Sequence, residues 1–236
     1  MMEILSRLAG NNIKKQENYM KLTGAIFDMD GTIMDSMVIW HNVGEKYLKL
    51  KGLTPHKNFN KTFLKMSIID SAKYFISDYG IEGDVDSIVA EINSLVEDFY
   101  RNEAELKPGI LDMLTEMKKQ GIKMAVATAT DKYLVEIALK RNNIYELFDC
   151  IYTCTEVGAD KNVTTIYDRS LDALGTEKSS TFVFEDSYHA IQTAKRGNYT
   201  VVGIADEYAK QNENEIRELS DIYIDNTANW RNYITL

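Results

Sequence analysis

The alternation of short apolar runs with amphipathic segments is the feature of this sequence that most constrains its fold. The run IKMAVATAT at 122–130 is almost entirely apolar, and similar runs follow at 150–156, 180–186, 200–206 and 221–225. Between these runs, helical patterns are expected at 131–142, 163–174, 188–196 and 211–219. Strands that are buried on both faces give near-continuous apolar runs. The pattern therefore predicts an α/β fold whose parallel sheet is covered by helices on both faces.

The N-terminal part contributes one more strand and a long helical insertion. The segment TGAIFDM, from Thr23, predicts a buried strand that ends at the turn formers Asp30 and Gly31. Helical patterns then follow at 36–51, with Ser36 as a cap, and at 60–65, 68–79 and 85–104. We therefore expect an α/β core built from 22–36 and 106–236, with an all-helical domain inserted at 37–105. Residues 1–21 have weak patterning and are interpreted as an N-terminal extension.

Composition and charge narrow the classes of function. The net charge of −9 argues against nucleic acid as a partner, and no segment approaches the roughly 20 apolar residues that a membrane-spanning helix needs. Glu3 and Arg7 interrupt any apolar signal core. Cys150 and Cys154 are expected to be reduced thiols. A cytoplasmic protein is the expectation, while the sequence does not specify its oligomeric state.

Polar side chains follow four of the predicted strands, where ligands bind in open parallel sheets. They are Asp28 and Asp30 after the first strand, Thr128 at the end of 122–130, Lys161 after 150–156, and Glu185 with Asp186 at the end of 180–186. Each alone has an ordinary structural explanation, such as a surface turn, a helix cap or a solvated lysine. Their convergence on one edge of the sheet predicts a catalytic site.

These residue types suit phosphoryl transfer with a magnesium ion. Mg²⁺ prefers oxygen ligands, which the carboxylates of Asp28 and Asp186 and the carbonyl of Asp30 can supply. Alternation along a strand places positions 28 and 30 on the same side. Asp28 can then attack phosphorus while Asp30 transfers protons to and from the reacting oxygens. Thr128 and Lys161 can hold the phosphoryl oxygens.

The motifs FDMDGTIMDS, VATATD, Lys161 and FVFEDS together resemble the four motifs of the haloacid dehalogenase superfamily, over about residues 22–210. The resemblance implies a Rossmann-like core and a mobile helical cap, as in the phosphatase and β-phosphoglucomutase branch. It makes Asp28 the nucleophile and a magnesium ligand, Asp30 the acid/base and carbonyl ligand, and Asp186 a magnesium ligand. Glu185 becomes a further ligand or an orienting partner. Thr128 and Lys161 become phosphate-binding residues.

Two positions depart from the usual motifs of this branch, and three further features indicate which activity within the family is expected. The segment after Lys161 lacks the prolines that are common in this branch, and Ala190 stands where a Gly is usual. Asp30 distinguishes the chain from dehalogenases and phosphonate hydrolases. Thr32, and the absence of Arg and Gly from 63–73, favour a phosphatase over a β-phosphoglucomutase-type mutase.

The expected substrate is a small phosphorylated metabolite, for which sugar phosphates, polyol phosphates and phosphoglycolate all fit. Candidate contacts in the insertion are Trp40, His41, Lys49 and Lys65, although core packing or surface exposure would also explain these residues. Two other classes stay open: a phosphate-accepting receiver domain, disfavoured by the order of its residues, and an inactive binding module.

Overall fold

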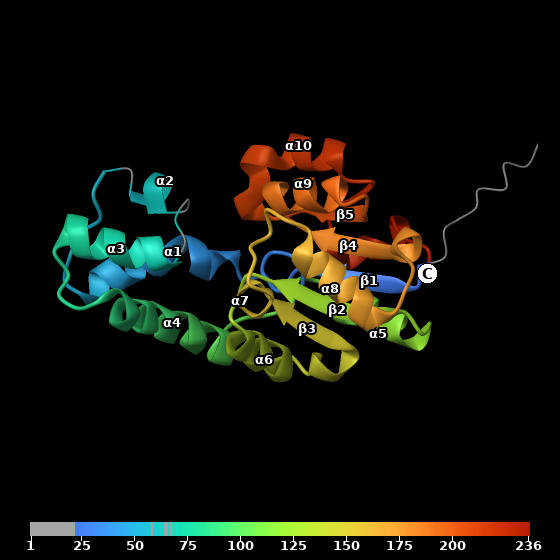
Figure 1. The fold of residues 1–236 in the computed structure, drawn as a ribbon, viewed down its shortest axis with the longest axis horizontal. Helices are drawn as coiled ribbons and strands as arrows, with labels where there is room; N and C mark the ends of the chain where they lie inside the picture. Colours follow the sequence, from blue (N-terminus) through green and yellow to red (C-terminus); the bar gives the residue numbers. More distant parts are fainter. Residues whose placement is uncertain (1–21, 58, 64–65, 67) are drawn as a thin grey trace, which may run out of the picture.

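The computed structural model describes residues 22–57, 59–63, 66 and 68–236, and its centre is a six-stranded parallel sheet. The strand order is β3-β2-β1-β4-β5-β6, and Figure 1 labels the first five strands in this order. The strands are β1 (Gly24–Phe27), β2 (Lys123–Thr128), β3 (Cys150–Thr153), β4 (Thr181–Glu185), β5 (Thr200–Ile204) and β6 (Ile222–Ile224). The predicted α/β fold class is confirmed.

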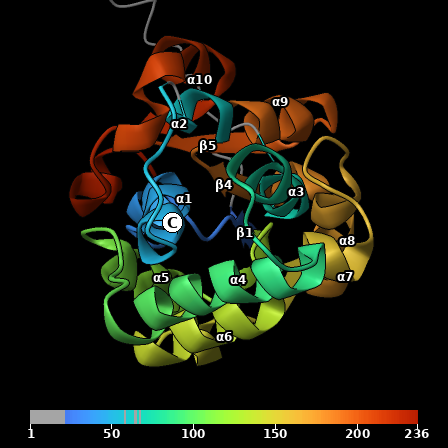
Figure 2. The same cartoon turned by 90° about the vertical axis from the view of Figure 1, so that its left-hand side faces the viewer.

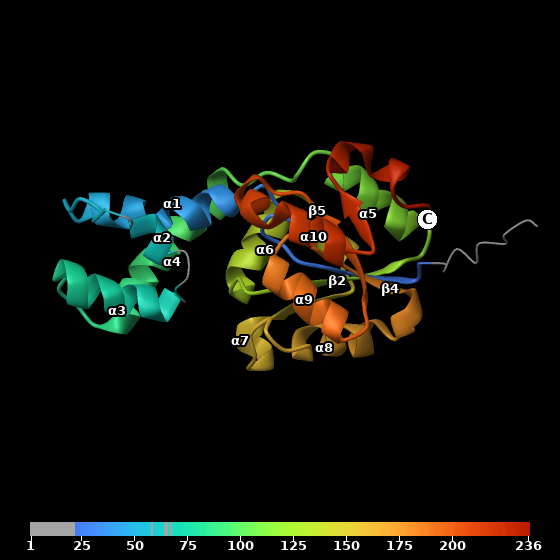
Figure 3. The ribbon, with the colours of Figure 1, turned by 90° about the horizontal axis from the view of Figure 1, so that it is seen from above.

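Helices cover both faces of the sheet, because alternate strand residues point to opposite sides. Ala25 and Phe27 pack with α5 (Ile110–Lys119) and α6 (Lys132–Arg141). Ile26 packs on the other face with α8 (Thr165–Leu174) and α9 (Tyr188–Arg196). Figure 3 shows α8 and α9 on one side of the sheet and α5 on the other. The remaining core elements are α7 (Cys154–Val157), α10 (Glu213–Leu219) and the 3₁₀ turns η1 (Tyr145–Leu147), η2 (Lys178–Ser180), η3 (Glu207–Asn212) and η4 (Thr227–Asn232).

A helical insertion lies beyond the carboxyl ends of the strands, in front of the sheet in Figure 2. It contains α1 (Met37–Leu50), α2 (Phe59–Phe63), α3 (Ile68–Tyr79) and α4 (Val85–Asn102). The two chain segments that join it to the core pair with each other. Met34 forms an antiparallel bridge with Leu106, and the backbone N–H of Asp35 donates to the carbonyl of Glu105 at 2.9 Å.

Several local features differ from those predicted from the sequence. Helix α5 was not predicted, and the strand expected at 150–156 ends at Thr153. The Thr153 hydroxyl and the Glu156 carboxylate form a reciprocal capping box there that starts α7. The side chain of Ser36 does not cap α1. No helix in the described part of the chain combines the length and apolar character needed to cross a membrane.

Candidate active site

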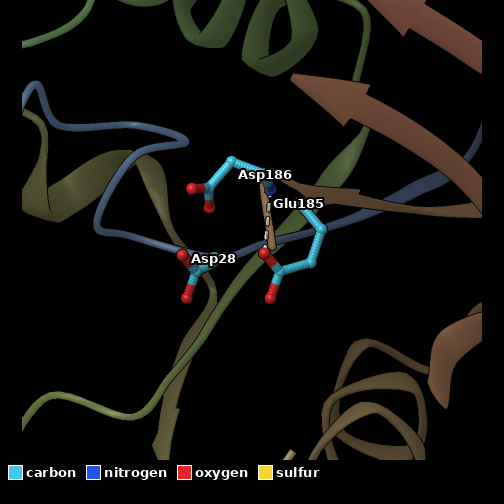
Figure 4. A group of neighbouring side chains, drawn as sticks. All are labelled: Asp28, Glu185 and Asp186. Atoms are coloured by element: carbon cyan, nitrogen blue, oxygen red, sulfur yellow. Dashed lines mark hydrogen bonds between the residues drawn. The ribbon is translucent and has the colours of Figure 1, made fainter. Parts of the chain in front are cut away.

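Three buried carboxylates gather at the carboxyl edge of the sheet. Strand register places them together, because Phe27 of β1 pairs with Phe184 of β4, so the residues that follow lie side by side. One side-chain oxygen from each of Asp28, Glu185 and Asp186 lies within 4.8 Å of those of the other two (Figure 4). The three residues are 7%, 1% and 4% exposed, respectively. Asp28 and Asp186 are thus close enough to share one cation.

Lys161 links two members of this carboxylate cluster. Its Nζ lies 2.5 Å from Oδ1 of Asp28 and 2.6 Å from Oε1 of Glu185. The other oxygen of Glu185 accepts hydrogen bonds from the backbone N–H groups of Asp186, at 2.9 Å, and Ser187, at 3.1 Å. Glu185 is therefore rigidly oriented, and it in turn fixes the ammonium group of Lys161 beside Asp28.

Burial and mutual repulsion disfavour the negative charges of the cluster. Burial, followed by the charge of Glu185, raises the pKa of Asp28 to about 8, although Lys161 opposes the shift. Burial and the charges of Glu185 and Asp28 raise the pKa of Asp186 well above its usual value. Burial opposes the charge of Lys161, but Asp28 and Glu185 hold the pKa of its ammonium group well above the usual range. Lys161 therefore remains cationic, yet its charge does not cancel the upward shifts in the pKa values of Asp28 and Asp186.

This cluster suits a magnesium ion. All three groups offer carboxylate oxygens, the donors that Mg²⁺ prefers, and they converge on one point. A divalent cation would also stabilise the anionic forms of Asp28 and Asp186, which burial and mutual repulsion disfavour. The donor chemistry therefore fits the expected cofactor, with Asp28, Glu185 and Asp186 as the candidate side-chain ligands.

The turn after β1 brings Asp186 into place. Gly31 has a φ of +81°, and a Cβ atom at this position would lie 2.3 Å from Oδ2 of Asp186. The neighbouring Thr32 donates its hydroxyl proton to Oδ1 of Asp186 at 3.2 Å. A glycine is needed here both for the left-handed backbone and for the close approach of the carboxylate.

Three hydroxyl groups hold the carboxylate of Asp30. Ser36 donates to Oδ1 at 2.5 Å, Thr130 donates to Oδ2 at 2.6 Å, and Tyr100 also donates to Oδ1. Burial, followed by the charge of Asp30, raises the pKa of Tyr100 well above its usual value, so its phenol stays protonated. Trp40 donates its indole N–H to the Tyr100 oxygen at 3.0 Å.

The site residues predicted in the α/β core line one cavity. This site cavity has a volume of about 570 Å³, within the range of small-ligand sites. All six predicted site residues of the α/β core line it: Asp28, Asp30, Thr128, Lys161, Glu185 and Asp186. The Thr128 oxygen accepts the backbone N–H of Thr130 at 3.1 Å, which leaves the Thr128 hydroxyl proton free to donate to a ligand.

The four residues of the insertion that were predicted to contact the substrate differ in whether they line a cavity. Trp40 lines both the site cavity and an adjoining cavity of about 780 Å³. His41 lines only the adjoining cavity, where its ring lies 4.2 Å from that of Tyr208. Lys49 is exposed in the last turn of α1 and lines neither cavity. Lys65 lies outside the described residues.

The residues that orient the Asp30 carboxylate were not predicted as site residues from the sequence. Ser36 was interpreted as a helix cap, whereas its hydroxyl binds Asp30. Thr130 follows Thr128 with the spacing of two that places strand residues on one side, and this signal was available. Tyr100 lies 70 residues from Asp30 in the sequence, and no local pattern connects them.

The chain belongs to the haloacid dehalogenase-like hydrolase family, since the sequence profile of that family matches residues 25–204. The matched region begins in β1 and ends with β5, so it includes the helical insertion and every residue of the carboxylate cluster. The predicted family is confirmed.

Two relatives are named as phosphatases. The mitochondrial (DL)-glycerol-3-phosphatase 1 of Arabidopsis thaliana is 26% identical over 133 residues, which cover 56% of this chain and 44% of the relative. Pyrophosphatase PpaX of Bacillus cereus is 24% identical over 168 residues, which cover 67% of this chain and 71% of the relative. The chain thus spans less than half of the length of the plant enzyme.

Solved structures share the fold. CbbY of Rhodobacter sphaeroides, crystallised in complex with phosphate, has a TM-score of 0.74 and 22% identity, with 89% of this chain and 96% of CbbY covered. A β-phosphoglucomutase of Clostridium difficile has a TM-score of 0.67 and 21% identity, with 88% of this chain and 92% of the mutase covered. The likeness includes the helical insertion, because it extends over nearly the whole of each chain.

Proposed function

We propose that this protein is a magnesium-dependent phosphatase that hydrolyses a small phosphorylated metabolite through an aspartyl-phosphate on Asp28. The observation that carries the proposal is the convergence of Asp28, Glu185 and Asp186, with Lys161 in contact with two of them. Membership of a hydrolase family and relatives named as phosphatases support it.

In the first step, Asp28 attacks the phosphorus atom of the bound ester. Magnesium, held by Asp28, Asp186 and the carbonyl of Asp30, would reduce the repulsion between the carboxylate and the phosphate dianion. Lys161 and the Thr128 hydroxyl bind the phosphoryl oxygens and stabilise the charge that develops there. Asp30 protonates the leaving oxygen, so the alcohol departs as a neutral molecule.

In the second step, Asp30 acts as a base toward water. Having lost its proton to the leaving group, its carboxylate accepts one from the water molecule that attacks the phosphorus of the aspartyl-phosphate. The bond between phosphorus and the Asp28 oxygen breaks. Inorganic phosphate is released, and the free Asp28 carboxylate is restored. Lys161 and Thr128 bind the phosphoryl oxygens in both steps.

We propose that the helical insertion acts as a cap domain over the active site. We assign 22–36 and 106–236 to a catalytic core and 37–105 to the cap, while residues 1–21 lie outside the described part of the chain. Met37 and Trp40 of α1 line the site cavity, so α1 contributes to the wall that a substrate meets. Closure of the cap would exclude water while Asp28 takes the phosphoryl group, and opening would admit the water that releases it.

The charge of the cavities favours a monophosphate. Among the described residues that line the two cavities, Lys161 is the one lysine or arginine. Its ammonium group lies beside Asp28 and serves the reacting phosphate. A second phosphate, as in a mutase cycle with a bisphosphate, would meet no further lysine or arginine among these lining residues, and only the imidazoles of His41 and His189. This supports hydrolysis over a phosphomutase reaction.

A panel of phosphorylated metabolites tests the proposal by phosphate release with and without magnesium. It should include glycerol 3-phosphate, phosphoglycolate, pyrophosphate, several sugar monophosphates, and β-glucose 1-phosphate with a bisphosphate activator. We expect magnesium-dependent release from at least one monophosphate. Faster formation of glucose 6-phosphate than of free phosphate would instead identify a mutase. Stable phosphorylation of Asp28 by acetyl phosphate without turnover would indicate a phosphate-accepting domain.

A further inference from the structure

The hydroxyl groups around Asp30 come from three separate parts of the chain. Ser36 precedes α1, Tyr100 lies in the last turns of α4, and Thr130 follows β2 in the core. We propose that Tyr100 is a positioning residue that holds the Asp30 carboxyl in the orientation needed for proton transfer, with its own hydroxyl oriented by Trp40. This inference rests on the proposed function, since it assumes that Asp30 is the acid/base.

The direction of the hydrogen bonds follows from the chemistry of the donors. An indole N–H can only donate, so the Tyr100 oxygen must accept from Trp40. The single phenol proton of Tyr100 is then directed to Asp30. Tyr100 is fully buried at 0% exposure, so no solvent molecule competes for this proton. The result is a fixed chain of donors from Trp40 through Tyr100 to Asp30.

This chain connects the acid/base to both ends of the helical insertion. Trp40 lies in α1, the first helix of the insertion, and Tyr100 lies in α4, its last helix. Ser36 adds a second contact from the entering segment. Asp30 is thus bound on Oδ1 by Tyr100 of the insertion and by Ser36, the residue just before it, and on Oδ2 by Thr130 of the core. Loss of the Tyr100 hydroxyl would leave Oδ1 held by Ser36 alone and Oδ2 by Thr130, so the carboxyl would be fixed less firmly toward the leaving oxygen.

The dependence of the rate on the leaving group separates positioning of the acid from general damage. Phenyl phosphate needs a proton on its leaving oxygen, whereas 2,4-dinitrophenyl phosphate releases a stable anion without one. The two esters are similar in shape, and kcat/KM reports the step that forms the aspartyl-phosphate. A defect in Asp30 should therefore slow the first ester much more than the second.

The test variant is Tyr100→Phe, and the matched control is Tyr47→Phe. Tyr47 also lies in the insertion, is 2% exposed, and donates its hydroxyl to a carboxylate, Glu91, at 2.5 Å. It therefore reproduces the loss of a phenol–carboxylate hydrogen bond from a buried tyrosine, although the Glu91 side chain is 47% exposed, at a position that lines neither cavity. Asp30→Asn serves as the reference for complete loss of acid/base chemistry, which is worth about 10²- to 10⁴-fold in rate.

We expect Tyr100→Phe to lower kcat/KM for phenyl phosphate by about 10-fold or more, within the range set for general acid/base catalysis. For 2,4-dinitrophenyl phosphate the decrease should stay below about 2-fold, and Tyr47→Phe should change neither value by more than that. Thermal unfolding of each variant checks that it is folded. Trp40→Phe should show a smaller loss with the same selectivity.

Two results would overturn the inference alone: an equal decrease on both esters in Tyr100→Phe, or no decrease on either, while Asp30→Asn remains selective. If Asp30→Asn itself shows no dependence on the leaving group, the role of Asp30 in the proposed function is wrong, and the inference fails with it. An absence of magnesium-dependent turnover of both esters and of every monophosphate in the metabolite panel by the unmodified protein would contradict the proposed function directly.

Discussion

Replacement of Gly31 by alanine provides a sharp test of how the turn after β1 builds the metal site. The added Cβ would lie 2.3 Å from Oδ2 of Asp186 and 2.7 Å from its Cγ. Non-bonded contacts of a Cβ below 3.0 Å are essentially never observed. The Asp186 carboxylate would therefore have to move by about 0.7 Å or more. Mg²⁺ requires near-ideal octahedral geometry with ligands at about 2.0–2.1 Å, so a shift of this size removes Asp186 as a ligand.

Gly121→Ala is the matched control for backbone strain. Gly121 has a φ of +74°, close to the +81° of Gly31, but nothing lies within 4 Å of the position where its Cβ would be. Both substitutions should cost about 1–2 kcal/mol, because an alanine is strained in the left-handed region. In a protein of this size, this corresponds to a decrease in Tm of about 2–8 °C.

The two variants should differ in their dependence on magnesium. Titration of phosphatase activity with magnesium should give an apparent affinity at least about 10-fold weaker in Gly31→Ala, equivalent to about 1.4 kcal/mol, and unchanged in Gly121→Ala. Isothermal calorimetry with magnesium alone checks the binding directly. If the two variants bind magnesium with equal affinity, the close approach of Gly31 to Asp186 does not shape the metal site, and our reasoning is refuted.

Three further predictions concern the carboxylate cluster. Asp28→Asn should keep the fold but lower turnover by several orders of magnitude, measured as phosphate release, because monoester hydrolysis without a catalyst is among the slowest reactions that enzymes accelerate; turnover close to that of the unmodified protein would reject covalent catalysis by this residue. Magnesium at about 100 times its Kd should stabilise the protein by about 2.7 kcal/mol and raise Tm by about 5–10 °C, and chelation or Asp186→Asn should remove this increase. Lys161→Met should lower the free energy of unfolding in urea by about 3 kcal/mol, since it leaves Asp28 and Glu185 without their buried partner. Lys132→Met, which breaks an exposed pair with Glu156 of the same 2.5 Å length, should cost less than about 1 kcal/mol; equal losses in the two lysine variants would contradict the importance of burial.

The fold was predictable because its strands are buried on both faces. Such strands leave near-continuous apolar runs in the sequence, and a parallel sheet brings the residues that follow them to one edge. Asp28, Thr128 and Asp186 could therefore be placed together without knowledge of the contacts between them. The helix over 110–119 was missed although Ile110, Met113, Leu114 and Met117 have helical spacing and are buried.

The contacts that orient the site could not be predicted in the same way. The bond between Tyr100 and Asp30 depends on how α4 returns to the core, and no periodic pattern in the sequence encodes that geometry. The short strand at 150–153 shows another limit. Its apolar character continues into Cys154, but the capping box of Thr153 and Glu156 ends the strand and starts a helix. Local hydrogen bonds thus determine where this strand ends, which the apolar pattern alone does not specify.

Rapid acid quenching during turnover, followed by mass spectrometry of the peptide that contains Asp28, tests the central claim most directly. We predict phosphorylation of Asp28 at early times in the presence of magnesium and a substrate, and its absence when Asp28 is replaced or magnesium is removed. In Asp30→Asn it should accumulate with 2,4-dinitrophenyl phosphate, because this ester needs no acid to form the aspartyl-phosphate while hydrolysis of the intermediate has lost its base. Sustained phosphate release with no phosphorylation of Asp28 at any time would contradict the account.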